Sequence, residues 1–137
     1  MEDAIVTRTA RIWLGDDDLV HLQPHARREQ NLEDAKENVA AVKKACGGYP
    51  KPLLIHFQAA APQTPECRAH YLSHEACSAV TAVAIVTNSM LGRIVGNLMI
   101  GMHSTGAPVR LFDNHEKAVT WLQASRAPTA RASGARR

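Results

Sequence analysis

The stretch VTAVAIVTN, residues 80–88, is dominated by β-branched and small apolar side chains. A second run of this kind, PLLIHF, occupies residues 52–57. Short continuous apolar runs are typical of strands in the middle of a parallel sheet, where helices cover both faces. The two runs therefore predict a pair of central buried strands and an α/β fold.

The segment between these strands carries helix signals. Thr64 and Pro65 form an N-cap and first-turn pair, which predicts a helix over residues 65–79. A strand, a crossover helix and a second strand are most simply joined in parallel. We therefore expect a parallel βαβ unit at the centre of the chain.

The N-terminal part predicts a hairpin followed by a helix. Residues 4–14 and 19–23 favour strands, and the intervening GDDD supplies turn residues, so we expect the two strands to be antiparallel. Asn31 then caps a helix with apolar residues at spacings of three and four. Gly47 is a typical residue to end that helix.

The C-terminal part continues the alternation. Ser89 opens an apolar helix over residues 90–103, residues 109–112 form the last strand, and Asn114 caps a final helix. The expected order is β-β-α-β-α-β-α-β-α. The fold class is therefore α/β, with a mixed, mostly parallel sheet of about five strands and four helices.

Positive charge is concentrated at the C-terminal end. Residues 126–137 hold four arginines and no acidic residue, so without them the net charge of +3 becomes −1 for residues 1–125. The segment is rich in Ala, Ser, Pro and Gly, and we expect a disordered basic tail after a single domain over residues 1–125. A nucleic-acid partner is not expected, because the excess charge belongs to the tail.

Targeting signals are not evident. The first residues, MEDAIVTRTA, lack the basic region and the apolar stretch of a signal peptide. No apolar run reaches the roughly 18 residues that a transmembrane helix needs. Three cysteines cannot all pair within one chain, and free thiols are typical of a reducing compartment. We therefore expect a cytoplasmic protein.

Two motifs add a family resemblance to this element order: AVAIVTNSMLGRIVGNLMI at 82–100 and PVRLFDNHEKAVTWL at 108–122. Together they resemble the STAS-like superfamily, which includes bacterial anti-sigma-factor antagonists and whose sheet is related to that of CRAL-TRIO lipid-binding domains. The similarity spans residues 4–124 and points to a small, uncharacterised bacterial branch. The matching residues are Arg68, Ala84, Ser89, Arg93, Val95, Gly96, Asn97, Pro108, Arg110, Phe112, Glu116, Ala118, Trp121 and Leu122.

The resemblance implies a non-enzymatic regulatory or protein-interaction domain that forms a homodimer or binds a protein partner. A small-molecule or lipid-binding module is the alternative, and an enzyme that uses His56 is a weaker one. Antagonists of the partner-switching type carry an Asp-Ser pair after the central strand, and the partner kinase phosphorylates that Ser. Here His56 stands where an acidic residue is usual, and Thr64, the nearest hydroxyl, is better interpreted as an N-cap.

Polar residues follow the two central strands. Ligands in parallel α/β sheets favour the carboxyl ends of the strands, so these positions are candidates for binding. None is a nucleophile beside an oriented base, so we predict no catalytic residue and no cofactor. The predicted ligand- or partner-binding residues are His56, Gln58, Thr64, Arg68, Asn88, Ser89 and Arg93.

The helix expected over 90–103 is a predicted interface. Gly92 and Gly96 lie four residues apart, a spacing that lets another backbone approach closely, and Ile100 continues the same flank. Close packing within the fold is the other interpretation of the two glycines. A homodimer or ligand contact is the functional one.

The stretch ECRAHYLSHEAC, residues 66–77, places Cys67, His70, His74 and Cys77 on one face of the expected middle helix. The two cysteines would lie about 15 Å apart along a straight helix, since each residue advances ~1.5 Å. Four such ligands cannot close on one zinc ion, so no metal site is predicted. We expect this face to point away from the sheet and His70 and His74 to be interface candidates.

Overall fold

The computed structural model describes residues 4–25, 29–56, 63–87 and 107–134, with the side chains of the last helix described as far as Ala124. One six-stranded sheet runs in the order β1-β2-β3-β4-β5-β6. β1, β2 and β3 are antiparallel, and β3 to β6 are parallel. The strands are β1 (Ile5–Val6), β2 (Ala10–Leu14), β3 (Val20–Pro24), β4 (Lys51–His56), β5 (Val80–Val86) and β6 (Val109–Phe112). The predicted fold class, a mixed and mostly parallel α/β sheet, is confirmed.

The sheet has one strand more than the five expected. The predicted strand over residues 4–14 is two strands, because the chain turns back between β1 and β2. The N–H of Thr7 donates to the carbonyl of Ala10 at 2.9 Å, and the N–H of Ala10 donates to the Thr7 hydroxyl at 3.0 Å. These local bonds replace the ladder that a single continuous strand would make.

Helix α1 (Leu32–Cys46) begins and ends where the sequence predicts. Its N-cap Asn31 and Asp34 form a capping box, in which each side chain accepts the other's backbone N–H. Gly47 ends the helix with φ at 70°, the left-handed conformation that glycine adopts without strain.

The single helix predicted over residues 65–79 is wrong. The structure has α2 (Pro65–Tyr71) and a short α3 (His74–Cys77) instead. Ser73 separates them, since its hydroxyl accepts the N–H of Ala76 at 3.2 Å and so caps a new helix. The break turns the two cysteines inward. The expectation that their face points away from the sheet is therefore wrong for Cys67 and Cys77, which are both buried.

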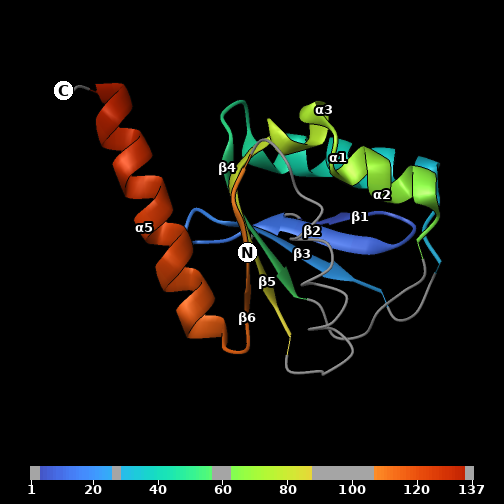
Figure 1. The fold of residues 1–137 in the computed structure, drawn as a ribbon, viewed down its shortest axis with the longest axis horizontal. Helices are drawn as coiled ribbons and strands as arrows, with labels where there is room; N and C mark the ends of the chain where they lie inside the picture. Colours follow the sequence, from blue (N-terminus) through green and yellow to red (C-terminus); the bar gives the residue numbers. More distant parts are fainter. Residues whose placement is uncertain (1–3, 26–28, 57–62, 88–106, 135–137) are drawn as a thin grey trace.

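Two layers of helices cover the sheet. Figure 1 shows α1, α2 and α3 on one side of it and α5 (His115–Gly134) on the other. The first core lies between the sheet and α1 and includes Ile12, Val20, Val42 and Leu53, and the second lies under α5 and includes Leu19, Leu54, Ala118 and Leu122. The central strands β4 and β5 place side chains in both cores, as Leu53 and Leu54 of β4 do.

Several predictions concern segments that the structure does not describe or describes only in part. The helix expected over 90–103 falls outside the described residues. Helix α5 includes residues 126–134, for which the composition predicts disorder, so the boundary at residue 125 stays a prediction.

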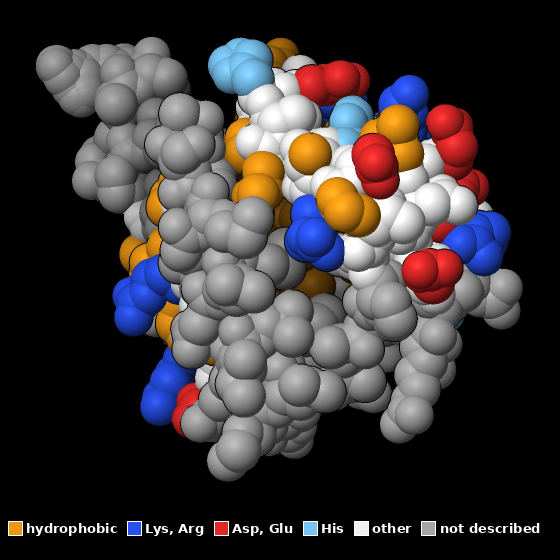
Figure 2. Space-filling view, turned by 45° about the vertical axis from the view of Figure 1, so that its right-hand side comes forward, with side chains coloured by type: hydrophobic (Ala, Val, Ile, Leu, Met, Phe, Trp, Pro, Cys, Tyr) orange, Lys and Arg blue, Asp and Glu red, His pale blue; other side chains and the backbone are white. Residues whose placement is uncertain are grey.

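No helix within the described ranges is long and apolar enough to cross a membrane. On the face drawn in Figure 2, Lys and Arg are interspersed with Asp and Glu, so the described residues there form no basic patch.

The capping box gives a first testable prediction. Asn31→Ala is expected to lower the free energy of unfolding by about 1 kcal/mol, because one N–H in the first turn of α1 loses its acceptor. Asn31→Ser, which keeps an acceptor oxygen, is expected to retain most of that stability. Urea unfolding of the three proteins is the measurement, and equal midpoints for Asn31→Ala and the natural chain would contradict the role given to the cap.

Candidate functional site

The described members of the predicted binding set do not come together. His56 ends β4 and points to the α5 side of the sheet, where its ring stacks on that of His115. Thr64 caps α2, since its hydroxyl accepts the N–H of Cys67 at 3.1 Å. Arg68 donates to the carbonyl of Gln63 at 2.8 Å, which secures the start of the same helix. Thr64 and Arg68 thus have structural contacts that explain their residue types.

Most of the other predicted site residues lie in segments that the structure does not describe. Gln58, Asn88, Ser89, Arg93, Gly92, Gly96 and Ile100 lie outside the described residues. His70 is half-buried and His74 is exposed, and their role in an interface stays a prediction. Within the parts of the chain that the structure describes, no three His, Cys, Asp or Glu side chains are placed to hold a metal ion.

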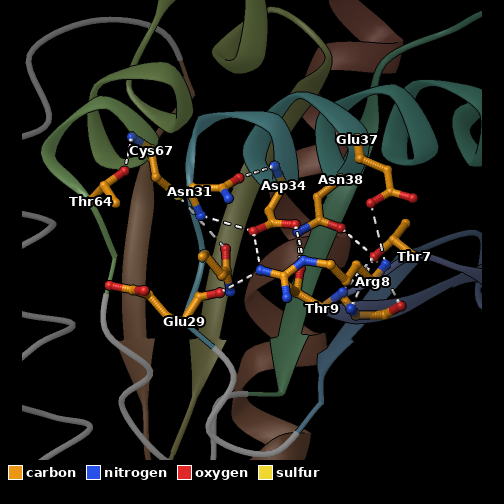
Figure 3. Close-up of polar contacts among 12 residues, drawn as sticks. Thr7, Arg8, Thr9, Glu29, Asn31, Asp34, Glu37, Asn38, Thr64 and Cys67 are labelled. Atoms are coloured by element: carbon orange, nitrogen blue, oxygen red, sulfur yellow. Dashed lines mark hydrogen bonds and ion pairs between the residues drawn. The ribbon is translucent and has the colours of Figure 1, made fainter.

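A buried polar network on the α1 side of the sheet was not predicted (Figure 3). Its centre is Asn38 of α1, which is 1% exposed. The Asn38 amide nitrogen donates to Thr9 Oγ1 and to Tyr71 Oη, both at 2.9 Å, and its oxygen accepts from the Thr7 hydroxyl at 2.6 Å. The network thereby joins the β1–β2 turn, α1 and the end of α2. The sequence did hold a signal, because Asn38 interrupts the apolar face between Ala35 and Val42.

The network continues to Gln30, which lies just before α1. The hydroxyl of Tyr71 accepts a hydrogen bond from Asn38, so its own O–H is left to donate to Gln30 Oε1 at 2.6 Å. Burial raises the pKa of this hydroxyl, and it therefore stays protonated. Burial also raises the pKa of the neighbouring Cys67 thiol to about 11, which keeps that thiol neutral.

An ion pair holds the outer end of the network in place. Arg8, in the β1–β2 turn, contacts the Asp34 carboxylate through Nε at 2.7 Å and Nη2 at 2.6 Å. Nη2 also donates to the carbonyl of Glu29 at 2.7 Å. Since Asp34 belongs to the capping box of α1, the same carboxylate connects the start of that helix to the turn that carries Thr7 and Thr9 (Figure 3).

A partly open cavity of about 160 Å³ lies beside this network, between the sheet and helices α1 to α3. Its walls are mainly aliphatic, and they include Leu22, Val39, Val42, Leu53, Ile55, Leu72, Ala76, Val80, Val83, Ile85 and Val109. The polar groups in its lining are contributed by Gln30, Asn38, Gln63 and Tyr71. None of the described lining residues carries a formal charge. Apolar walls with a few polar groups are typical of small-molecule sites.

The opposite face of the sheet carries a row of flat side chains. Trp13 stacks on His21 with ring centroids 5.1 Å apart, His21 on His56 at 5.4 Å, and His56 on His115 at 5.7 Å. The guanidinium of Arg11 lies 4.6 Å from the Trp13 ring centroid, a cation–π contact. The row crosses β2, β3 and β4 and ends at the first residue of α5.

The directions of hydrogen bonds along this row follow from Asp17. Its carboxylate lies 3.3 Å from His21 Nε2, so that nitrogen carries the proton, and His21 Nδ1 then accepts from His56 Nε2 at 3.1 Å. Gly15 makes the close approach feasible. A Cβ atom at position 15 would lie 2.7 Å from Asp17 Oδ1 and 2.9 Å from His21 Nε2.

The row is a weak basis for catalysis. Burial, with smaller contributions from His21 and His115, lowers the pKa of His56 to about 4, so His56 is neutral at neutral pH. Among the described residues, no hydroxyl or thiol makes a hydrogen bond to the histidines of the row, so no nucleophile is placed beside them.

Comparison with solved structures defines the class of the domain. A crystal structure of an uncharacterized protein of the DUF3478 family with a SpoIIAA-like fold, from Shewanella loihica PV-4, has a TM-score of 0.56. It is 15% identical, over 89% of this chain and 92% of that one. A protein with unknown function from Arthrobacter sp. FB24 is 22% identical over 82% and 97% of the two chains, but its TM-score of 0.30 is too low to bear on the fold. The fold is thus STAS-like, as the resemblance implied.

The family model described as a domain of unknown function, DUF7793, matches residues 12–126. The chain therefore belongs to that family. No curated protein matches the chain. The comparisons establish the fold and the family, and an argument for function must come from the cavity, the network and the histidine row.

The network predicts a stability effect at Asn38. Asn38→Leu keeps the volume but leaves Thr7, Thr9 and Tyr71 without their shared partner, at an expected cost of about 1–3 kcal/mol in the free energy of unfolding. Lys36→Leu, at an exposed position of the same helix, is the control and is expected to change little. Urea unfolding measures both, and an Asn38→Leu variant as stable as the control would refute the importance of the network.

The histidine row predicts a pH dependence. The pKa of His56 is about 4 in the folded chain and about 6.5 in an unfolded one, so below pH 6.5 the unfolded state binds more protons. The stability contributed by neutral His56 is therefore complete above pH 6.5 and is lost as the pH falls towards 4. In His56→Gln the melting temperature is expected to depend less on pH between 6.5 and 4. His74→Gln should show the same pH dependence of the melting temperature as the natural chain. Parallel profiles for His56→Gln and the natural chain would argue against a neutral, half-buried His56.

Proposed function

We propose that this chain is a non-enzymatic, STAS-like regulatory domain that binds a small, mostly apolar molecule in the cavity between the sheet and helices α1 to α3. Ligand binding in the cavity would then alter how the chain binds a protein partner or a second copy of itself. The observation that carries the proposal is the cavity itself, with its aliphatic walls and the polar groups of Gln30, Asn38, Gln63 and Tyr71.

The volume and the lining of the cavity support ligand binding. An apolar engineered cavity of about 150 Å³ in another protein binds benzene, so a volume of about 160 Å³ suits a molecule of one small ring. Such a ligand would gain packing contacts with the aliphatic walls.

The regulatory part of the proposal rests on the fold alone. STAS-like domains include regulators that act by protein contact, and a fold by itself does not decide function. The enzymatic alternative at His56 has less support, since His56 is neutral and contacts two other imidazoles rather than a nucleophile. The proposal includes neither a cofactor nor a nucleic-acid partner.

A pair of matched variants tests the cavity. Val83 and Val86 both lie half-buried in β5, but Val83 lines the cavity and Val86 packs in the core under α5. Val83→Phe is expected to fill free space, to keep or raise the melting temperature, and to abolish binding of a one-ring hydrocarbon such as toluene. Val86→Phe is expected to overpack its core, at a cost of about 1–3 kcal/mol, and to leave toluene binding intact.

The measurements are thermal unfolding and a titration with toluene followed by NMR. Native mass spectrometry of the freshly purified chain adds an independent readout, since a retained small molecule is expected on the natural chain and not on Val83→Phe. If toluene does not perturb the residues around the cavity in the natural chain, the proposed function fails. Destabilisation by Val83→Phe as large as that by Val86→Phe would contradict the existence of free space.

A further inference from the structure

The side chain of Gln30 lines the cavity and carries two amide donors. Gln30 is 7% exposed and lines the cavity wall. Its backbone is held by a parallel bridge to Gln63, in which the Gln30 carbonyl accepts the N–H of Thr64 at 3.0 Å. The backbone of Gln30 is therefore held by the bridge to Gln63, and its side chain lies in the interior rather than on the surface.

The orientation of the Gln30 amide follows from the network. Thr7 donates to the Asn38 oxygen, Asn38 donates to Tyr71, and Tyr71 must then donate to Gln30 Oε1 at 2.6 Å. The thiol of Cys67 also lies near this oxygen, at 3.9 Å. The oxygen side of the amide is thus fully used.

The nitrogen side is not used. Gln30 Nε2 carries two N–H donors, and neither has a hydrogen-bond acceptor among the described residues. Gln30 Nε2 is not one of the described buried atoms that lack a partner, so it is within reach of a water molecule. A ligand that displaces this water has to offer an acceptor in its place, because a buried donor left without one costs about 1–3 kcal/mol.

The residue types in the rest of the described lining indicate whether the ligand is charged. The described lining residues include neither Lys nor Arg, so a carboxylate or phosphate would find no counter-charge among them. Burying an ionised group without a partner is far more costly than burying a neutral carbonyl. An uncharged acceptor therefore fits the site better than the headgroup of a fatty acid or phospholipid.

We propose that the cavity recognises an uncharged molecule with a compact apolar body and one carbonyl-type oxygen, which accepts a hydrogen bond from Gln30 Nε2. The class comprises small ketones, aldehydes, esters and amides of about one ring. The inference rests on the proposed function, because it assumes that the cavity takes a ligand, and it adds the polar group by which the ligand is selected. The network from Thr7 to Tyr71 acts as the device that orients the donor.

Cyclohexanone and methylenecyclohexane are the probes, since they have nearly the same shape and differ in C=O against C=CH₂. The natural chain is expected to bind the ketone about 3- to 10-fold more tightly, the ratio that one net hydrogen bond gives. Gln30→Met, which keeps the side-chain length and removes the donors, is expected to bind both probes equally. Gln23→Met, at an exposed position of β3 outside the cavity lining, is the matched control and should keep the preference.

The outcomes separate the two proposals. If neither probe binds the natural chain, the proposed function fails together with this inference. If both bind the natural chain equally, the cavity stands and the role of Gln30 is overturned. If Gln30→Met keeps the preference for the ketone, the assignment of the donor is overturned.

An observation on the natural chain covers the case in which Gln30→Met does not fold. The side-chain amide resonances of Gln30 are expected to shift on addition of cyclohexanone and to stay in place with methylenecyclohexane. Equal shifts with both probes would contradict the hydrogen bond. A titration with cyclohexanecarboxylate is expected to show no binding at neutral pH, and tight binding of this anion would overturn the preference for an uncharged ligand.

Discussion

The hydrogen bonds of Asn38 are the constraint on which one half of the molecule depends. The amide joins three segments that are remote in the chain: Thr7 and Thr9 in the β1–β2 turn, α1, and Tyr71 at the end of α2. A buried amide is stable only when its partners are in place, so the network specifies how these elements meet. It also borders the cavity and orients Gln30 there, so the geometry of the site follows from the packing of the fold.

The parts of the fold that were predictable are those set by near neighbours in sequence. Helix α1 begins after the N-cap Asn31 and ends at Gly47, as predicted, because caps act within one turn of the helix. The two errors arose where a hydroxyl competes locally for backbone groups. Thr7 ends β1 early, and Ser73 starts a new helix, and both residue types also fit the regular elements that the sequence favours.

The candidate site was much less predictable, because its contacts are distant in sequence. Tyr71 and Gln30 are 41 residues apart, and Thr7 and Asn38 are 31 apart, so no local pattern announces either hydrogen bond. The strand-end rule did select His56, and its described partners come from β3 and from the start of α5. A cavity cannot be predicted from one sequence at all, since it depends on how well side chains from several elements fill the space between them.

The neutral state of His56 has a calorimetric consequence. In mildly acidic solution an unfolded chain protonates this imidazole, whereas the folded chain leaves it uncharged. Unfolding at such a pH therefore draws a proton from the buffer. The measured heat of unfolding then depends on the ionisation enthalpy of the buffer chosen, and two buffers at the same pH report different heats for the same structural change.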